Sequence, residues 1–197
     1  MTVTFKTLAA GAAIAVAVAA GSVGGAAAAP NLVTNGGFET GDFTGWLAAA
    51  NSYPMYIVTS PVQEGAYAAQ IAGYSYGPDT LSQVISTAVG QTYTLSFWYS
   101  QDQALLNGID VTWNGSSVYA ATDELVGGYQ HVLASVVGTG SDSLVFGAYN
   151  DPAFTYLDNV SVSAAVPEPA TWALSIVGFG LLGATVRRRR QQAAATA

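Results

Sequence analysis

The residues of this chain that could do chemistry are chiefly carboxylates, and they lack cationic partners. All twelve Asp and Glu residues lie between positions 39 and 168, whereas the five basic residues are Lys6 and Arg187–Arg190, near the two ends. A carboxylate buried in the central part therefore needs backbone N–H donors, a proton or a bound cation, because an uncompensated buried charge is costly. The same distribution excludes nucleic-acid binding by the central part, since phosphate groups are neutralised by Lys and Arg.

Groups suited to nucleophilic or redox chemistry are scarce. The chain has no Cys, which excludes disulfides, thiol catalysis and cysteine metal sites, and its single histidine, His131, excludes a multi-histidine metal centre. The sequence has no H-E-x-x-H motif and no P-loop. We therefore expect no enzymatic activity, with a glycosidase-like pair of carboxylates far apart in the chain as the open alternative.

Asp158 is the most informative carboxylate. In the expected strand at 155–162 it has the same parity as Val160 and Val162, which predicts that its side chain faces the core. With no Lys or Arg to pair with it, calcium is a fitting partner, because this ion binds carboxylates together with carbonyl oxygens of glycine-rich loops. The alternative is that backbone N–H donors alone hold the carboxylate.

Carbohydrate binding requires exposed aromatic side chains beside polar ones, and Trp98 is the best candidate. In the segment 92–99 apolar and polar residues alternate, so that Tyr93, Leu95 and Phe97 share one face. Trp98 lies on the other face with serine and threonine, which predicts a platform for a sugar ring. The alternative is packing in the core or in a second layer, as is usual for aromatic residues of a sandwich.

The elements that would position these residues are short β-strands. Turn dipeptides such as Asn-Gly and Gly-Gly recur along residues 29–165, and no window of ten residues there has the period of a helix. This segment is therefore expected to form one domain, an all-β antiparallel β-sandwich of the jelly-roll type. The expected strands are 55–59, 67–71, 80–87, 92–99, 109–113, 117–121, 129–137, 144–149 and 155–162.

The first 28 residues have the features of a secretory signal peptide. Lys6 provides the positive charge, an apolar run extends from Leu8 to Ala20, and small residues precede a predicted cut after Ala28. The alternative is a retained N-terminal membrane helix. A cleaved signal peptide predicts that the body is exported by way of signal peptidase.

The C-terminal end combines a rigid segment, an apolar segment and a basic cluster. Residues 166–170 contain two prolines, and residues 171–186 are apolar. A helix over 170–186 would span about 25 Å of a bilayer core about 30 Å thick. The cluster Arg187, Arg188, Arg189 and Arg190 would stop it at the cytoplasmic side, with the body outside. We expect residues 191–197 to be a disordered tail.

The order of these features resembles the PEP-CTERM sorting domain of Gram-negative bacteria, over residues 166–190. The resemblance implies that Pro167, Glu168 and Pro169 form the recognition motif of an exosortase, a transpeptidase-like membrane enzyme. It also implies that the tail is a sorting signal cut near this motif, and that the protein reaches the cell surface or is secreted. An ordinary membrane anchor is the alternative.

A second resemblance covers the body. The opening segment 31–46, with Asn-Gly-Gly-Phe-Glu, and the closing segment 156–162 resemble the galactose-binding-like jelly roll of several carbohydrate-binding modules. In those modules a structural calcium joins the opening loop to the last strand. The resemblance implies that Glu39 and Asp158 ligate it by their side chains and that Glu64 lies where a further ligand is supplied, often a carbonyl.

Two functions are compatible with these features, and the first is preferred. The first is a structural or interaction protein of the cell surface or of an extracellular matrix rich in exopolysaccharide. The alternative is a carbohydrate-binding module that holds exopolysaccharide. In both, the membrane is contacted only through the C-terminal helix, before exosortase acts.

The sorting signal makes a prediction about the mature protein. If exosortase cuts near Pro167–Pro169, mass spectrometry of the surface fraction should find no peptide from Thr171 onward. Glu168→Ala should leave uncut precursor in the inner membrane. Intact Arg190 in the mature surface fraction would contradict the sorting signal and favour the ordinary anchor.

Overall fold

A computed structural model describes residues 29–165 apart from 52, 74–76, 103–104 and 125, and this described part consists of strands and connections without a helix. The strands are β1 (Leu47–Ala49), β2 (Tyr56–Val58), β3 (Ala68–Ile71), β4 (Asp79–Ser86), β5 (Thr92–Gln101), β6 (Asn107–Trp113), β7 (Ser116–Thr122), β8 (Val126–Val137), β9 (Ser141–Asn150) and β10 (Thr155–Ala164). The expected signal peptide and C-terminal helix lie outside the described residues. Among those described, no helix could cross a membrane.

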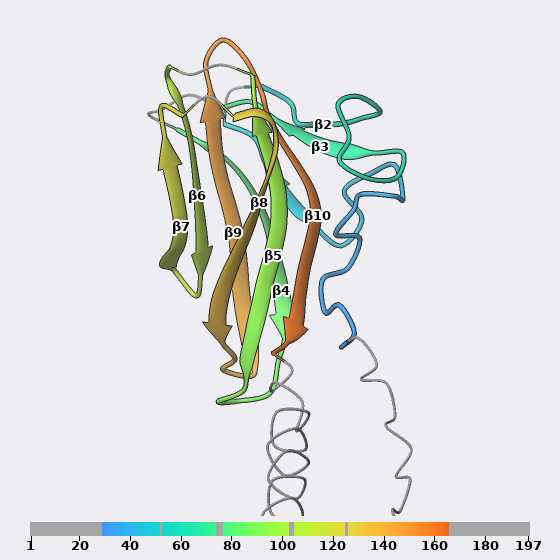
Figure 1. Ribbon diagram of the computed structural model, residues 1–197, viewed down its shortest axis with the longest axis vertical. Coiled ribbons are helices and arrows are strands. Elements are labelled where there is room, and N and C mark those ends of the chain that lie inside the picture. Colours follow the sequence, from blue (N-terminus) through green and yellow to red (C-terminus); the bar gives the residue numbers. More distant parts are fainter. Residues whose placement is uncertain (1–28, 52, 74–76, 103–104, 125, 166–197) are drawn as a thin grey trace, which may run out of the picture.

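The strands form two five-stranded antiparallel sheets. One has the order β1-β4-β9-β6-β7 and is called the β9 sheet; the other has the order β2-β3-β10-β5-β8 and is called the β10 sheet. Figure 1 shows long strands running the length of the sandwich, with β6 and β7 at one side and β2 and β3 at the other. The expected all-β sandwich is confirmed. The sequence did not predict β1, whose three residues are all exposed and show no alternation.

The core lies between the sheets and is rich in aromatic rings. Phe97 of β5 and Phe146 of β9 meet edge to face, with ring centroids 5.1 Å apart. Trp46 packs against Phe146 at 6.1 Å, and its indole N–H donates to the Asn35 carbonyl oxygen at 3.1 Å. Trp46 therefore anchors the opening segment to the core.

The opening segment lies beside the closing strand. The N–H of Leu32 donates to the Val162 carbonyl oxygen at 2.8 Å, and the N–H of Val160 donates to the Gly36 carbonyl oxygen at 2.9 Å. The Asn31 side chain also bonds to the backbone of β10 at both of these residues. The first described residues and the last strand are thus joined as one unit.

Asp142 of β9 holds three connections together. Its fully buried carboxylate accepts hydrogen bonds from Thr87, which follows β4, from Asn114 in the β6–β7 turn at 2.6 Å, and from the N–H and hydroxyl of Thr139 in the β8–β9 turn. Burial raises the pKa of Asp142, but the side-chain donors outweigh that effect and hold the pKa at about 2.

We predict that Asp142→Ala lowers the free energy of unfolding by about 2–3 kcal/mol, because the buried donors of three connections lose their acceptor. Thermal unfolding should show a loss of several degrees. Asp110→Ala is the matched control, because Asp110 is exposed and accepts a side-chain bond only from Ser117; it should change stability by less than about 1 kcal/mol.

The Asp142 carboxylate also makes the stability of the fold depend on pH. The pKa of Asp142 lies below its ordinary value of 3.8, so the stabilisation is complete above about pH 4 and is lost as the pH falls toward 2. The stability difference between wild type and Asp142→Asn should shrink over that window. A difference that stays constant from pH 6 to pH 2 would contradict this role.

Candidate functional site

A groove with a volume of about 280 Å³ runs over the outer face of the β9 sheet. Strand alternation produces it, because Leu81, Ile109 and Phe146 fill the core while the residues between them face outward. Most of the outward residues are small or short, so the face is hollow. Residues that line it include Thr80, Gly108, Asp110, Thr112, Gly147 and Tyr149.

Tyr149 provides the aromatic surface of the groove. It pairs with Gly108 across β9 and β6, and its ring lies over that glycine, so that a Cβ at Gly108 would overlap the ring. The side chain is half-buried. An aromatic ring held against the sheet beside small residues leaves space for a flat, ring-shaped ligand.

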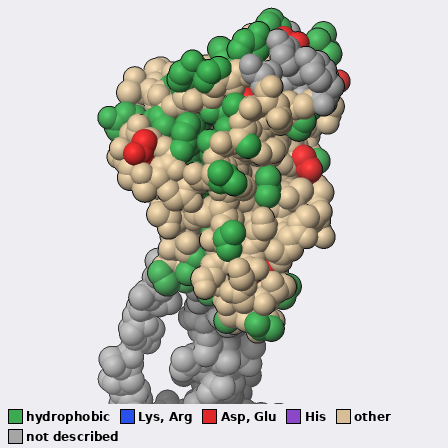
Figure 2. Space-filling model, turned by 180° about the vertical axis from the view of Figure 1, so that it is seen from behind, with side chains coloured by type: hydrophobic (Ala, Val, Ile, Leu, Met, Phe, Trp, Pro, Cys, Tyr) green, Lys and Arg blue, Asp and Glu red, His purple; other side chains and the backbone are tan. Residues whose placement is uncertain are grey.

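Asp110 provides hydrogen-bond acceptors in the same groove. Its exposed carboxylate accepts one bond from the Ser117 hydroxyl at 2.5 Å, which leaves lone pairs for a ligand. No Lys or Arg occurs from Thr7 to Val186, and no basic side chain appears on the described part of the face in Figure 2. The groove is therefore suited to a neutral ligand that donates hydroxyl hydrogen bonds.

Trp98 lies on the outer face of the opposite sheet, as the alternation of β5 predicts. It is half-buried, and its ring stacks on the imidazole of His131, with centroids 4.4 Å apart and 7° between the planes. His131 also shares a hydrogen bond of 2.7 Å with the Ser96 hydroxyl. Trp98 is thus outside the core, and its ligand-binding role stays a prediction.

Asp158 is fully buried, but it does not face the core. It pairs with Trp98 across β10 and β5, so both side chains lie on the outer face of the β10 sheet. The predicted inward direction is wrong because a β-bulge interrupts the alternation at this point. Asn159 has a positive φ of 48°, and Leu157 and Val160 both enter the core.

Asp158 is buried because the segment 61–67 lies over it. Its Oδ2 accepts bonds from the backbone N–H groups of Gln63 at 2.9 Å and Glu64 at 3.3 Å, and its Oδ1 accepts one from Asn159 at 2.7 Å. Burial raises the pKa of Asp158; the backbone donors lower it, and the charge of Glu39 raises it again. The net direction is upward.

The structure brings Glu39 and Glu64 to the same segment. Glu39 accepts bonds from the N–H groups of Ala66 at 3.0 Å and Tyr67 at 3.2 Å, and Glu64 accepts one from the Asn159 amide at 3.1 Å. In the described part of the chain, no three acidic or histidine side chains group so as to hold a metal ion. A calcium ion here would need carbonyl ligands as well.

Residues 73–77 read G-Y-S-Y-G and so match the G-x-S-x-G pattern of a nucleophile elbow. That motif acts on a sharp turn from a strand into a helix. Here the next element is strand β4, which begins at Asp79, and Ser75 lies outside the described residues. The structural context of a nucleophile elbow is therefore not met.

The sequence of the body matches a known family over most of the chain. Residues 30–170 match the carbohydrate binding domain family. The chain belongs to this family. Of the two functions compatible with the sequence, membership of a carbohydrate binding domain family supports the second.

Solved carbohydrate-binding modules share the fold. TmCBM61, solved in complex with β-1,4-galactotriose, has a TM-score of 0.54 and 19% identity, over 69% of this chain and 99% of that chain. The CBM22-1 xylan-binding domain of Xyn10C from Paenibacillus barcinonensis has a TM-score of 0.53 and 15% identity, over 71% and 97%. At these identities the likeness establishes the sandwich fold.

Two curated relatives are large toxins. The multifunctional-autoprocessing repeats-in-toxin proteins of Vibrio vulnificus and Vibrio cholerae are 30% and 29% identical over 141 and 149 residues, which are 67% and 72% of this chain. The chain spans 3% of the length of each toxin.

The C-terminal resemblance is confirmed by sequence comparison. Residues 165–190 match the PEP-CTERM protein-sorting motif. This range contains Pro167, Glu168 and Pro169 as well as the arginine cluster Arg187–Arg190. All of these residues lie outside the part that the structure describes.

The sequence predicted the strand that carries Tyr149 but not its role. A signal was present at Gly147, which lies inside the expected strand 144–149, where glycine marks the close approach of a ligand or of another group. Gly108 precedes the expected strand 109–113 and belongs to the turn dipeptide Asn107-Gly108. The pairing of Gly108 with Tyr149 joins strands far apart in the chain, which alternation within one strand does not predict.

Proposed function

We propose that the body of this carbohydrate binding domain protein binds a neutral polysaccharide along the groove of the β9 sheet. The observation that carries the proposal is the Tyr149 ring held over Gly108 beside the Asp110 carboxylate. A pyranose ring has a face of C–H groups that packs on an aromatic ring, and hydroxyl groups at its edge that donate to carboxylate oxygens.

The charge distribution supports a neutral rather than an acidic polysaccharide. The chain has a net charge of −7, and its basic residues are confined to the termini. An acidic chain would bring its carboxylates toward Asp110 without a counter-charge. The ligands named for two fold neighbours, β-1,4-galactotriose and xylan, are consistent with a site for neutral sugars.

Export places this site outside the cell. The PEP-CTERM motif at 165–190 implies a C-terminal sorting signal and hence an exported protein processed by exosortase. The natural ligand would then be the extracellular polysaccharide of the producing bacterium. Membrane contact through the C-terminal segment precedes processing, and the released or surface-held body binds the matrix.

The groove is tested by affinity electrophoresis of the full chain in a sugar-free detergent, with xylan, galactan and polygalacturonate in the gel. We expect at least one neutral polysaccharide to retard the protein. Tyr149→Ala should weaken that binding about tenfold, equivalent to about 1.4 kcal/mol. Gly108→Ala should weaken it too, because the added Cβ displaces the ring.

Two variants serve as controls. Tyr56→Ala removes a tyrosine that is 54% exposed on β2 of the other sheet, and it should bind like wild type. Trp98→Ala tests the opposite face. If binding is lost in Trp98→Ala and kept in Tyr149→Ala, the groove is not the binding site. If no neutral polysaccharide retards the protein, the structural or interaction role is favoured.

We propose further that a structural calcium ion joins the opening segment to β10. Glu39 and Asp158 contact one short segment, and the charge of Glu39 raises the pKa of Asp158, so a cation near both would be favoured. Gly65, with a φ of +73°, contributes to the fit, because a Cβ there would overlap the Glu39 carboxylate. Carboxylate and carbonyl oxygens are the ligands that calcium takes.

Chelation should therefore lower the melting temperature of the protein by several degrees, and calcium should restore it. Extracellular modules bind calcium with dissociation constants of about 10⁻⁴–10⁻³ M, and a hundredfold excess over that constant adds about 2.7 kcal/mol. Asp158→Asn should abolish the dependence, whereas Asp42→Asn, an exposed residue of the opening segment, should keep it. Identical melting in chelator and in millimolar calcium would mean that backbone donors alone hold Asp158.

A further inference from the structure

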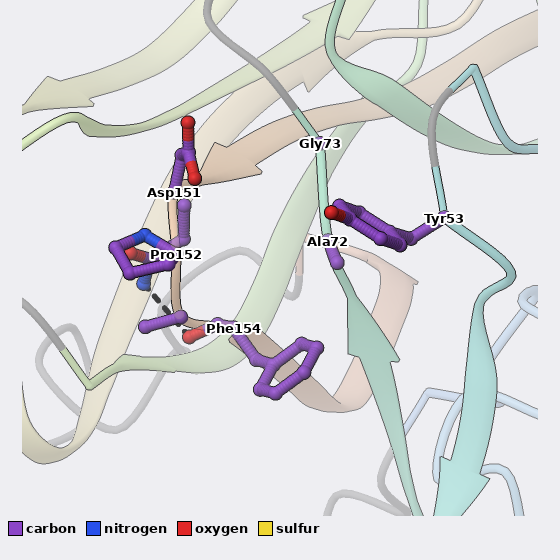
Figure 3. A pocket seen from close by; sticks show the side chains of 8 residues that line it. Tyr53, Ala72, Gly73, Asp151, Pro152 and Phe154 are labelled. Carbon is purple, nitrogen blue, oxygen red and sulfur yellow. Dashed lines mark hydrogen bonds between the residues drawn. The ribbon is translucent and has the colours of Figure 1, made fainter.

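A second cavity, of about 260 Å³, lies between the connections of the sandwich and has no lining residue in common with the groove. Three parts of the chain form it: Tyr53 from the β1–β2 connection, Ala72 and Gly73 after β3, and residues 150–154, which comprise the end of β9 and the connection to β10. Figure 3 shows Tyr53 and Phe154 on two sides of Ala72, with Asp151 and Pro152 on the wall away from Tyr53.

Asn150 gives this cavity an unused hydrogen-bond acceptor. The residue is 2% exposed; its amide Nδ2 donates to the Phe154 carbonyl oxygen at 2.8 Å, and its backbone N–H donates to that of Gly73 at 3.1 Å. These bonds fix the side chain, but its buried Oδ1 has no partner. An unsatisfied buried acceptor is costly, so a ligand that donates a hydrogen bond there would be favoured.

Two aromatic rings, those of Tyr53 and Phe154, line the same cavity as Asn150. Tyr53 is 52% exposed and Phe154 is 37% exposed, so a ligand in the cavity can contact both rings. Asp151 adds a carboxylate to the lining, and the body has no Lys or Arg. The cavity thus combines apolar walls with acceptors and has no cation for an anionic ligand.

We propose that this cavity binds a single neutral sugar ring at the end or side branch of a glycan chain. Its volume lies just below the usual range of ligand sites, which is about 300 to 1,000 Å³. Unlike the groove on the sheet face, the cavity is bounded by three separate parts of the chain, so it accommodates one ring rather than a chain interior. The C–H face of the ring packs against Phe154 or Tyr53, and a hydroxyl group donates to Asn150 Oδ1.

The proposal goes beyond the groove and does not depend on it. The groove is proposed to bind internal sugar units of a polysaccharide, whereas the cavity is proposed to bind one sugar ring. If both sites are occupied by one polysaccharide network, the second contact becomes intramolecular and the body is retained far longer than by either site alone.

The test uses small sugars that fill the cavity but cover little of the groove. The full chain in a sugar-free detergent is titrated with the methyl glycosides of galactose, glucose and xylose and with sodium galacturonate, and binding is followed by saturation-transfer NMR and calorimetry. We expect at least one neutral methyl glycoside to bind and galacturonate not to bind. Phe154→Ala and Tyr53→Ala should each weaken that binding at least fivefold.

The variants separate this site from the groove. Asn150 also holds its loop, so substitution there would mix folding with binding, whereas Tyr53 and Phe154 are exposed. Tyr149→Ala in the groove and Tyr56→Ala on β2 should leave the binding of the methyl glycoside unchanged. Three results would overturn the proposal: no neutral glycoside binds, binding survives both cavity variants, or binding is lost in Tyr149→Ala. Polysaccharide retardation that depends on Tyr149 would still support the groove in each case.

Discussion

The body contains no Lys or Arg, so its carboxylates are stabilised by hydrogen-bond donors instead. The positions of several connections between strands depend on these hydrogen bonds. Asp142, Asp158 and Glu39 each accept hydrogen bonds from segments far away in the chain, through backbone N–H groups, hydroxyl groups or an amide. Such charge-assisted bonds are shorter and stronger than neutral ones. The strands are held by their core, whereas several connections between them are held by acids, of which Asp142 and Asp158 are buried.

This arrangement leaves the two outer faces different. On the β10 sheet the segment 61–67 is drawn over the strands, because Asp158 binds its N–H groups and the Tyr129 hydroxyl donates to the Pro61 carbonyl oxygen at 3.1 Å. On the β9 sheet Asp142 has the inward parity of Leu144 and Phe146 and binds turns at the strand ends, whereas the outer face carries the groove. A long ligand therefore has an open groove on the β9 sheet.

The fold was predictable from the sequence because several long strands alternate, as Thr92–Tyr99 does, and turn signals separate the strands. The predictions that failed depend on single backbone features. The direction of Asp158 was wrong because of a bulge at Asn159, which a side-chain pattern does not reveal. The groove was missed because Gly108 and Tyr149 are adjacent only through strand pairing, although the carboxylates that meet at segment 61–67 were found through family resemblance.

The acidity of the body also bears on which ligands the two proposed sites would select. Charges on the surface are screened within about 8 Å at physiological ionic strength, so the net charge of −7 repels an acidic polysaccharide only once it is close to the surface. Selection at the two proposed sites would then come from the groups that line them, Asp110 in the groove and Asn150 and Asp151 at the cavity, all of which offer oxygen acceptors. Acceptors beside an aromatic ring favour hydroxyl groups over carboxylates, because a hydroxyl supplies the proton that the site lacks while a carboxylate adds a charge that nothing neutralises.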